Sequence, residues 1–329
     1  MRRASRLVFA IAFAFSLTGS VARGDTGAAS ATKVVVSWGT VAISNTPLWV
    51  TYKAGLFKKH GLDVDLQYVA STLQIPSLLS GSVQIGQVGG TNVVSADVGG
   101  ADLIILATLS PVFPYLFMVS SDIRTPAQLK GKAVGVSKFG DASDVGARIA
   151  MRHAGLDPKD VTFVQVGSST NRATALINGA IAGGVIIPPM NVELEAHGLH
   201  TLIDLARLRV PAADITITAR RSWVNAHRDV VQAYIDAIVE GIGKVRTDKA
   251  FAVATIKEYF KSDDDKAMAI GYDFFIREIL TSLPYPRTAQ FANSLDGLAT
   301  SNDKVKGFDV SKILDDSFLK SAAARARTR

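Results

Sequence analysis

The chain of 329 residues contains no cysteine. This absence excludes structural disulfides, Cys-ligated zinc, iron–sulfur clusters, thiol nucleophiles and a lipid anchor on an N-terminal cysteine. Charged residues are also few, at 20%, whereas hydrophobic residues make up 48% of the chain. Such a composition excludes a disordered tail protein, and the length is enough for two ordinary domains, each with a buried core.

The positive charge is concentrated at the two ends of the sequence. The formal net charge is +7, but residues 1–24 hold four arginines and no acidic residue. Without that segment 32 basic residues face 29 acidic ones, which leaves +3, and three further arginines lie within the last five residues. We therefore expect a near-neutral body that does not bind nucleic acid.

Residues 1–24 have the pattern of a signal peptide. Met1–Arg6 is basic, Leu7–Leu17 is an apolar run of 11 residues, and Ala22 and Gly24 are small residues at the positions that a signal peptidase reads. As a helix the run is only about 16 Å long, against roughly 30 Å of membrane hydrocarbon. We expect cleavage after Gly24, with Ala22 as the alternative, and an exported chain that does not insert into a membrane.

Strand and helix patterns alternate along the rest of the chain, which predicts an α/β fold with parallel sheets flanked by helices. Expected strands are 33–38, 63–69, 83–88, 103–108, 115–120, 133–137, 161–166, 184–187, 201–205 and 214–219. Expected helices are 45–60, 73–79, 92–98, 142–153, 170–178 and 190–197, and residues 227–277 are almost entirely helical.

The restart of this pattern after residue 121 predicts two lobes. We expect lobe 1 to comprise residues 33–120 and 214–310, including the C-terminal helices, and lobe 2 to comprise residues 121–213. Two crossing segments, at Val119–Arg124 and Leu208–Asp214, would then form a hinge that allows the lobes to close around a ligand.

Three motifs give the chain a family resemblance. Residues 47–64 begin with PLWV and continue with KAGLFKKHGLDV, residues 122–136 run from DIRT to LKGKAVGV, and GLDPKDV at 155–161 precedes ALINGA at 175–180. In order and spacing, over roughly residues 33–298, these motifs resemble ABC transporter substrate-binding proteins of the nitrate, sulfonate and taurine type.

The resemblance implies a periplasmic-binding-protein fold of type II and a monomer without catalytic residues or cofactor. It also implies a small, anionic organic ligand of the sulfonate or carboxylate type, and an ABC permease as partner. One departure concerns specificity, because residues 180–184 are apolar where the family carries an acidic residue. The cysteine-rich motif of a pyrimidine-synthesising branch is also absent.

Candidate ligand-binding residues lie where strands end and helices begin. At such junctions free backbone amides and the helix dipole favour anions. The candidates are Ser44, Asn45, Gly90, Thr91, Asn92, Ser137, Lys138, Phe139, Ser143, Ser169, Arg172 and Pro188. The alternative is that the Ser, Thr and Asn residues only cap helices, that the glycines serve turns, and that Pro188 only ends a strand.

Arg172 is the most specific of these candidates. A cation in the first turn of a helix is opposed by the helix dipole, and a bound carboxylate or sulfonate would compensate it. The alternative is that Arg172 points away and pairs with a surface acid. Phe113 and Phe139 are candidates for a pocket wall, with ordinary core packing as the alternative for both.

No pattern indicates catalysis or metal binding. The five histidines follow no metal-ligand spacing, and nucleotide-binding, nucleophile-elbow and zinc-protease motifs are absent from the sequence. Two other functions stay open at this point. One is a ligand sensor that docks on a receptor kinase, and the other is a secreted two-lobed enzyme.

Overall fold

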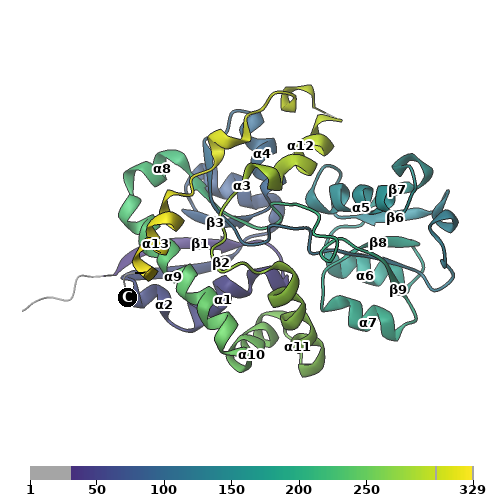
Figure 1. The fold of residues 1–329 in the computed structure, drawn as a ribbon, viewed down its shortest axis with the longest axis horizontal. Coiled ribbons are helices and arrows are strands. Elements are labelled where there is room, and N and C mark those ends of the chain that lie inside the picture. The colour runs from purple at the N-terminus through teal and green to yellow at the C-terminus, as the bar shows by residue number, and fades with distance from the viewer. Residues whose placement is uncertain (1–30, 301, 328–329) are drawn as a thin grey trace, which may run out of the picture. The chain divides into compact units, whose positions relative to one another are not determined.

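The computed structural model describes residues 31–300 and 302–327, so the expected signal peptide lies outside the described residues. Two five-stranded sheets organise this part of the chain (Figure 1). Both sheets are mainly parallel with one antiparallel strand inserted among the others, β10 in the first and β5 in the second. The predicted α/β class is confirmed.

The first sheet has the order β2-β1-β3-β10-β4. Its strands are β1 (Thr32–Trp38), β2 (Leu62–Tyr68), β3 (Ile85–Val88), β4 (Leu103–Thr108) and β10 (Thr216–Arg220). Its helices are α1 (Thr46–Lys53), α2 (Leu56–Lys59), α3 (Ser71–Ser80), α4 (Gly90–Val98), α8 (Arg221–Ala226), α9 (Arg228–Thr247), α10 (Lys249–Phe260), α11 (Asp265–Phe274), α12 (Ala292–Ala299) and α13 (Ser317–Arg327). We call this set of elements the first half.

The second sheet has the order β7-β6-β8-β5-β9. Its strands are β5 (Leu116–Val119), β6 (Ala133–Val136), β7 (Thr162–Gln165), β8 (Gly183–Ile186) and β9 (His200–Asp204), and its helices are α5 (Ala142–His153), α6 (Ser169–Ile177) and α7 (Met190–Ala196). We call this set the second half. Short helical turns complete the chain: η1 (Ile43–Asn45), η2 (Pro126–Leu129), η3 (Pro158–Asp160), η4 (Phe275–Ile279), η5 (Thr288–Phe291), η6 (Asp303–Val305) and η7 (Val310–Ile313).

Local sequence explains where the helices begin and end. The carboxylate of Asp141 accepts hydrogen bonds from the backbone N–H groups of Ser143 and Asp144, which caps the first turn of α5. One expected helix is wrong in its extent. The single helix predicted over residues 45–60 is two helices, α1 and α2, because Gly55 takes a left-handed conformation with φ of 69° between them.

The position of the first crossing is also corrected. β5 pairs with β8 and β9, so it belongs to the second sheet, although we expected residues 115–120 in lobe 1. The chain therefore crosses at residues 109–115 and not at Val119–Arg124. β5 is apolar and fully buried, and an apolar sequence of this kind does not indicate which of the two sheets the strand joins.

The two crossing segments run antiparallel and are hydrogen-bonded to each other. The backbone N–H of Phe113 donates to the carbonyl of Val210 at 3.0 Å, and that of Ala212 donates to Pro111 at 3.0 Å. Residues 208–214, where we expected the second crossing, thus lie in the second crossing segment. The two connections between the halves therefore form one short antiparallel pair.

Packing contacts outside the crossings, and one hydrogen bond from the second crossing segment, also join the halves. α12 packs against α5, where a Cβ on Gly297 would lie 2.9 Å from a methyl carbon of Val145. α11 packs on Pro189, which would lie 3.1 Å from a Cβ on Gly271. The guanidinium of Arg209 donates to the backbone carbonyl of Glu278 in η4. The halves therefore touch on either side of the crossing segments.

Aromatic and aliphatic packing holds the first half together. The indole of Trp49, which is fully buried, stacks on Tyr259 with ring centres 4.4 Å apart and also meets the edge of Trp38. Burying an apolar side chain of this size stabilises a fold by about 1.5–3 kcal/mol or more. These contacts fix α1 and α10 to the sheet, and with them the segment that follows β1.

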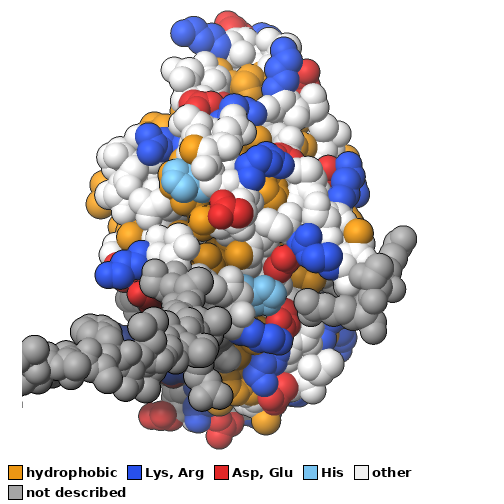
Figure 2. Space-filling view, turned by 90° about the vertical axis from the view of Figure 1, so that its left-hand side faces the viewer, with side chains coloured by type: hydrophobic (Ala, Val, Ile, Leu, Met, Phe, Trp, Pro, Cys, Tyr) orange, Lys and Arg blue, Asp and Glu red, His pale blue; other side chains and the backbone are white. Residues whose placement is uncertain are grey.

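Charges of both signs are interspersed on one face of the molecule. On the face seen in Figure 2, Lys and Arg side chains alternate with Asp and Glu side chains instead of forming a stripe. Within the described part of the chain, no helix combines the length and the apolar character needed to cross a bilayer.

Candidate functional site

The candidate residues follow the carboxyl ends of strands in both sheets, where ligands collect in α/β folds (Figure 1). Ser44 and Asn45 follow β1, residues 90–92 follow β3, residues 137–143 follow β6, Ser169 and Arg172 follow β7, and Pro188 follows β8. The structure brings some of these side chains into direct contact, and it gives others partners within the protein.

Arg172 connects three strand ends of the second half. Its side chain is 2% exposed. Nε donates to the carbonyl of Val185 in β8 at 2.9 Å, Nη2 donates to the hydroxyl of Ser169 at 2.9 Å, and Nη1 donates to Ser137 and to the carbonyl of Gly167. All of these acceptors are neutral oxygens, so the expected alternative, a surface acid as partner, is wrong.

Ser143 and Asp141 extend this network toward α5. The backbone N–H of Ser137 donates to Ser143 Oγ at 2.7 Å, and Ser143 Oγ donates to Asp141 at 2.6 Å. Ser137, Ser143, Ser169 and Arg172, four of the candidates, therefore form one contiguous set, which we call the Arg172 network. Asp141, which the sequence did not single out, is its nearest carboxylate.

Burial perturbs both charged groups of this network. Burial lowers the pKa of Arg172, an effect that the charges of Tyr115 and Asp141 oppose. Burial likewise raises the pKa of Asp141, against the hydrogen bonds from Ser143 and Asp144 and the charge of Arg172. A buried guanidinium without a hydrogen-bonded carboxylate is costly, and a bound anion beside it would reduce that cost.

A second polar pair joins the two crossing segments. The phenol of Tyr115 donates to Asp214 Oδ1 at 3.0 Å, and both side chains are buried. Burial raises the pKa of Asp214 to about 7, partly offset by the hydrogen bond from Tyr115. Neither residue of this pair was among the predicted site residues. The available signal was a single acidic residue between apolar neighbours, Ala213 and Ile215, at the crossing.

Buried polar atoms without partners lie at the corresponding edge of the first half. Ser44 and Asn45 are buried, and neither Ser44 Oγ nor Asn45 Oδ1 has a hydrogen-bond partner within the described chain. Asn45 does not cap α1 with its side chain, because its amide donates instead to the carbonyl of Thr40. Gln87, Thr108 and Ser110, in β3 and at the end of β4, also keep buried side-chain atoms unpartnered. Such atoms favour a polar ligand group at this edge.

Gly90 and Thr91, which follow β3, contact other residues of the protein closely. A Cβ on Gly90 would lie 2.6 Å from that of Ala213 and 2.7 Å from its carbonyl oxygen, so glycine is needed here for close backbone packing. Thr91 bonds through its hydroxyl to that of Ser294 in α12 at 2.7 Å. Asn92 is half-buried.

The remaining candidates divide between surface and core. Lys138 is exposed, and Phe139 is 50% exposed in the loop that follows β6. Phe113 is buried and stacks on Tyr115, with ring centres 5.7 Å apart, so its side chain is part of the core. Pro188 forms a cis peptide bond with Pro189, and it lines a cavity between the halves.

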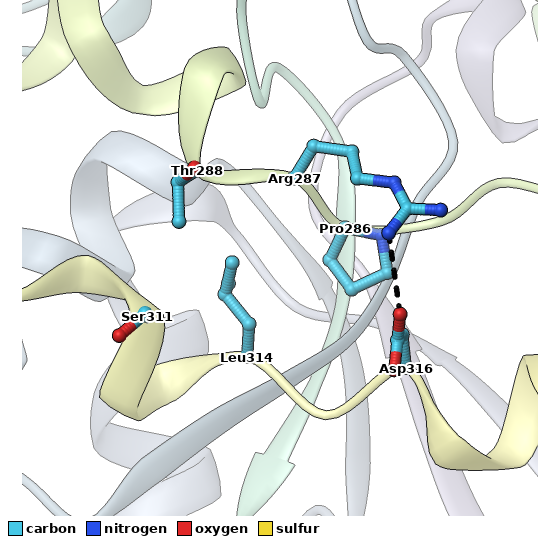
Figure 3. A pocket seen from close by; sticks show the side chains of 6 residues that line it. All are labelled: Pro286, Arg287, Thr288, Ser311, Leu314 and Asp316. Atoms are coloured by element: carbon cyan, nitrogen blue, oxygen red, sulfur yellow. Dashed lines mark hydrogen bonds and ion pairs between the residues drawn. The ribbon is translucent and has the colours of Figure 1, made fainter.

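Two cavities have different surroundings. The first, about 410 Å³, lies between β5, β9 and α7 of the second half and α11 and η4 of the first. The second, about 260 Å³, is lined only by residues of the first half within 286–316, among them Arg287 and Asp316, which form an ion pair at 3.3 Å (Figure 3). Only the cavity between the halves adjoins both of them. Residues 31–300 and 302–327 contain no cluster of three side chains suited to a metal ion.

Comparison with protein families gives one match. A family model described as NMT1/THI5 like matches residues 43–249, which is more than half of the chain. The matched stretch begins at η1 and ends within the helical region after β10, so it includes the Arg172 network and both crossing segments.

Two named relatives are similar in sequence. YtlA of Bacillus subtilis (strain 168), named as a candidate binding protein, is 27% identical over 242 residues, covering 71% of this chain and 72% of YtlA. A protein of Brachyspira hyodysenteriae, named as a candidate ABC transporter periplasmic binding protein, is 23% identical over 266 residues and 76% of each chain.

A solved structure identifies the fold. The periplasmic aliphatic sulphonate binding protein SsuA of Escherichia coli superimposes with a TM-score of 0.72 at 18% identity, over 88% of this chain and 99% of SsuA. This likeness confirms the predicted periplasmic-binding-protein fold.

Proposed function

The chain belongs to the NMT1/THI5-like family, and from that premise we propose that it is a periplasmic solute-binding protein of an ABC transporter. The proposed ligand is a small organic anion of the sulfonate or carboxylate type, which the two halves enclose as lobes. The names of SsuA and of the Brachyspira relative support the location and the transport role. The signal-peptide pattern of residues 1–24 supports export.

The observation that carries the proposal is the state of Arg172. Its charge is buried at the strand ends of the second half, and its hydrogen bonds go to neutral oxygens. The hydroxyls of Ser137 and Ser169, which it orients, are themselves able to donate to a ligand. A carboxylate or sulfonate beside this network would gain charge-assisted hydrogen bonds, each contributing roughly 1.5–3 kcal/mol.

The unpartnered atoms of the first half complete the proposed site. Ser44, Asn45 and Gln87 each have at least one buried hydroxyl or amide atom without a partner in the described chain, at the strand ends of the first sheet. A ligand that bonds to these groups and to the Arg172 network touches both halves only when they are together. It therefore stabilises the closed arrangement relative to an open one, and the permease distinguishes the two by shape.

Ligand identity is tested by a thermal-shift screen of the chain from residue 25 onward against sulfonates, carboxylates, nitrate and pyrimidines. A ligand at a hundredfold excess over Kd adds about 2.7 kcal/mol to the free energy of unfolding, which raises Tm by several degrees. A shift confined to organic anions supports the proposal. A shift confined to neutral or cationic solutes contradicts the anionic ligand, and no shift with any compound class contradicts solute binding of this kind.

Delivery to a permease is tested by transport. Deletion of the gene should abolish uptake of the ligand found in the screen, and the intact gene should restore it. Unchanged uptake in the deletion strain would contradict the transport role and would favour the sensing alternative.

A further inference from the structure

The turn at the start of the second crossing segment has an arginine at its left-handed position. After β9, the backbone N–H of Val210 donates to the carbonyl of Leu205 at 3.1 Å, and that of Arg209 donates to the carbonyl of Ala206 at 2.9 Å. Arg209 itself has a φ of 55°. Any side chain disfavours this conformation, so glycine is the usual residue at this position of such a turn.

Other turns of the same kind in the second half have glycine at this position. The helices α5, α6 and α7 are each followed by the same pair of backbone hydrogen bonds, and the left-handed residues there are Gly155, Gly179 and Gly198. Among the described residues, the other side chain at a positive φ is that of Lys261, in the turn after α10. Glycine would suit the turn better than Arg209, and a conformational cost of this kind points to a role for the side chain outside the turn.

The guanidinium of Arg209 bonds to the end of a helix in the first half. It donates to the backbone carbonyl of Glu278 in η4, which continues α11. The last carbonyls of a helix have no partner within the helix and form the negative end of its dipole, so a cation is favoured there. Arg246 of α9 bonds to the same helix end from within the first half, because its Nη2 donates to the carbonyl of Leu280 at 2.5 Å.

The same helix touches the second half at one more place. Gly271 of α11 packs on Pro189, and a Cβ on this glycine would lie 3.1 Å from the proline ring. Gly271 lies about two helical turns before the carbonyl that Arg209 contacts. The turn that carries Arg209 is fixed to the second sheet, since the backbone N–H of Leu205 donates to the carbonyl of Tyr115, next to β5, at 3.0 Å. The hydrogen bond of Arg209 therefore connects the second sheet to η4.

We propose that Arg209 is a positioning residue, whose hydrogen bond to η4 stabilises the arrangement in which the two halves are in contact. The bond forms only while η4 and the turn after β9 are adjacent, whereas the backbone bonds within that turn do not depend on the first half. It therefore favours the joined arrangement over a separated one, with or without a ligand. One consequence rests on the proposed function: Arg209 slows the release of a ligand that the halves enclose.

The test measures the separation of the halves in the ligand-free protein from residue 25 onward, so it does not depend on the identity of the ligand. Spin labels at Lys266→Cys in α11 and Ala196→Cys in α7, both exposed positions, report the distance between the halves by pulsed electron paramagnetic resonance. Arg209→Asn removes the guanidinium and supplies a residue that tolerates a positive φ. It should raise the ratio of long to short distances about threefold or more, because a hydrogen bond from a charged donor is lost, and it should leave Tm unchanged.

Two control variants separate this role from a general effect on the fold. Lys261→Asn replaces an exposed cation at the same position of the turn after α10, and Arg246→Gln removes the corresponding bond to η4 within the first half. Both should leave the distances unchanged. Equal distances in Arg209→Asn and wild type overturn the proposal, with or without a fall in Tm, and so does an equal shift in Arg246→Gln. Neither result bears on ligand binding, which the thermal-shift screen tests separately.

Discussion

Asp214 should make the stability of the protein depend on pH, and Asp214→Asn should remove that dependence. The carboxyl is buried at the junction of the crossing segments and accepts a hydrogen bond from Tyr115. Asparagine has nearly the same shape and keeps an oxygen that can accept this bond, but it carries no ionisable proton. The substitution therefore isolates the charge from the packing.

The sign follows from the direction of the shift. Burial raises the pKa of Asp214 from 3.8 to about 7 in the folded protein. Between these values the folded state retains a proton that the unfolded state has lost. The contribution of Asp214 to stability is therefore fully present below about pH 4 and is lost as the pH rises to about 7. At 1.36 kcal/mol for each tenfold change in proton affinity, the loss is on the order of 4 kcal/mol.

The assay is urea unfolding at pH values from 4 to 8, with wild type and Asp214→Asn compared at each. As the pH rises from 4 to 8, the free energy of unfolding of the wild type should fall by several kcal/mol relative to that of Asp214→Asn. Asp97, whose pKa burial raises to about 6, contributes equally to both proteins and cancels in the difference. Asp296→Asn, an exposed aspartate in α12, is the matched control. Parallel pH profiles for wild type and Asp214→Asn would refute the reasoning.

Two further predictions concern residues of the candidate site. Gly90→Ala should destabilise the protein by about 1–3 kcal/mol, since the added Cβ would lie 2.6 Å from that of Ala213; thermal unfolding measures this, and an unchanged Tm would contradict it. Arg172→Ala should weaken the best anionic ligand of the screen at least tenfold, about 1.4 kcal/mol, by calorimetry. Because Arg172 also donates hydrogen bonds to neighbouring carbonyls, Arg172→Lys serves as a second variant, which keeps the positive charge. Equal affinities in both variants and wild type would show that Arg172 does not contribute to the ligand site.

Much of the fold follows from sequence patterns. Each predicted strand between residues 33 and 219 is present within a few residues, because β-branched runs bounded by turn residues are a local signal. Sheet membership is not local. β5 follows β4 after a short connection with Pro111 and Pro114, yet it inserts between β8 and β9. Nothing in its own apolar sequence distinguishes the two sheets.

The candidate site was predictable where it depends on strand ends. Ser137, Ser143, Ser169 and Arg172 converge because parallel strands bring their carboxyl ends to one edge. The partnership of Tyr115 with Asp214 spans 99 residues and depends on the pairing of the crossing segments, which no local pattern encodes.

The lining of the cavity between the halves was not predictable from the sequence either. Leu116, Thr201 and Arg277 lie in segments far apart in the chain, and only the packing of the halves brings them together. The same applies to Gly90, whose role in close packing against Ala213 could not be separated in sequence from a role in approaching a ligand.

The distance between the two halves, measured with and without ligand, tests the central claim most directly. Because the chain has no cysteine, Lys58→Cys in α2 and Arg152→Cys in α5 give one exposed spin-label site on each half. A control pair, Lys58→Cys with Lys306→Cys, lies within the first half. Pulsed electron paramagnetic resonance should show the distance between the halves shifting to a shorter, narrower distribution at saturating ligand, with the control pair unchanged. Saturated binding that leaves the distance distribution between the halves unaltered would contradict the account.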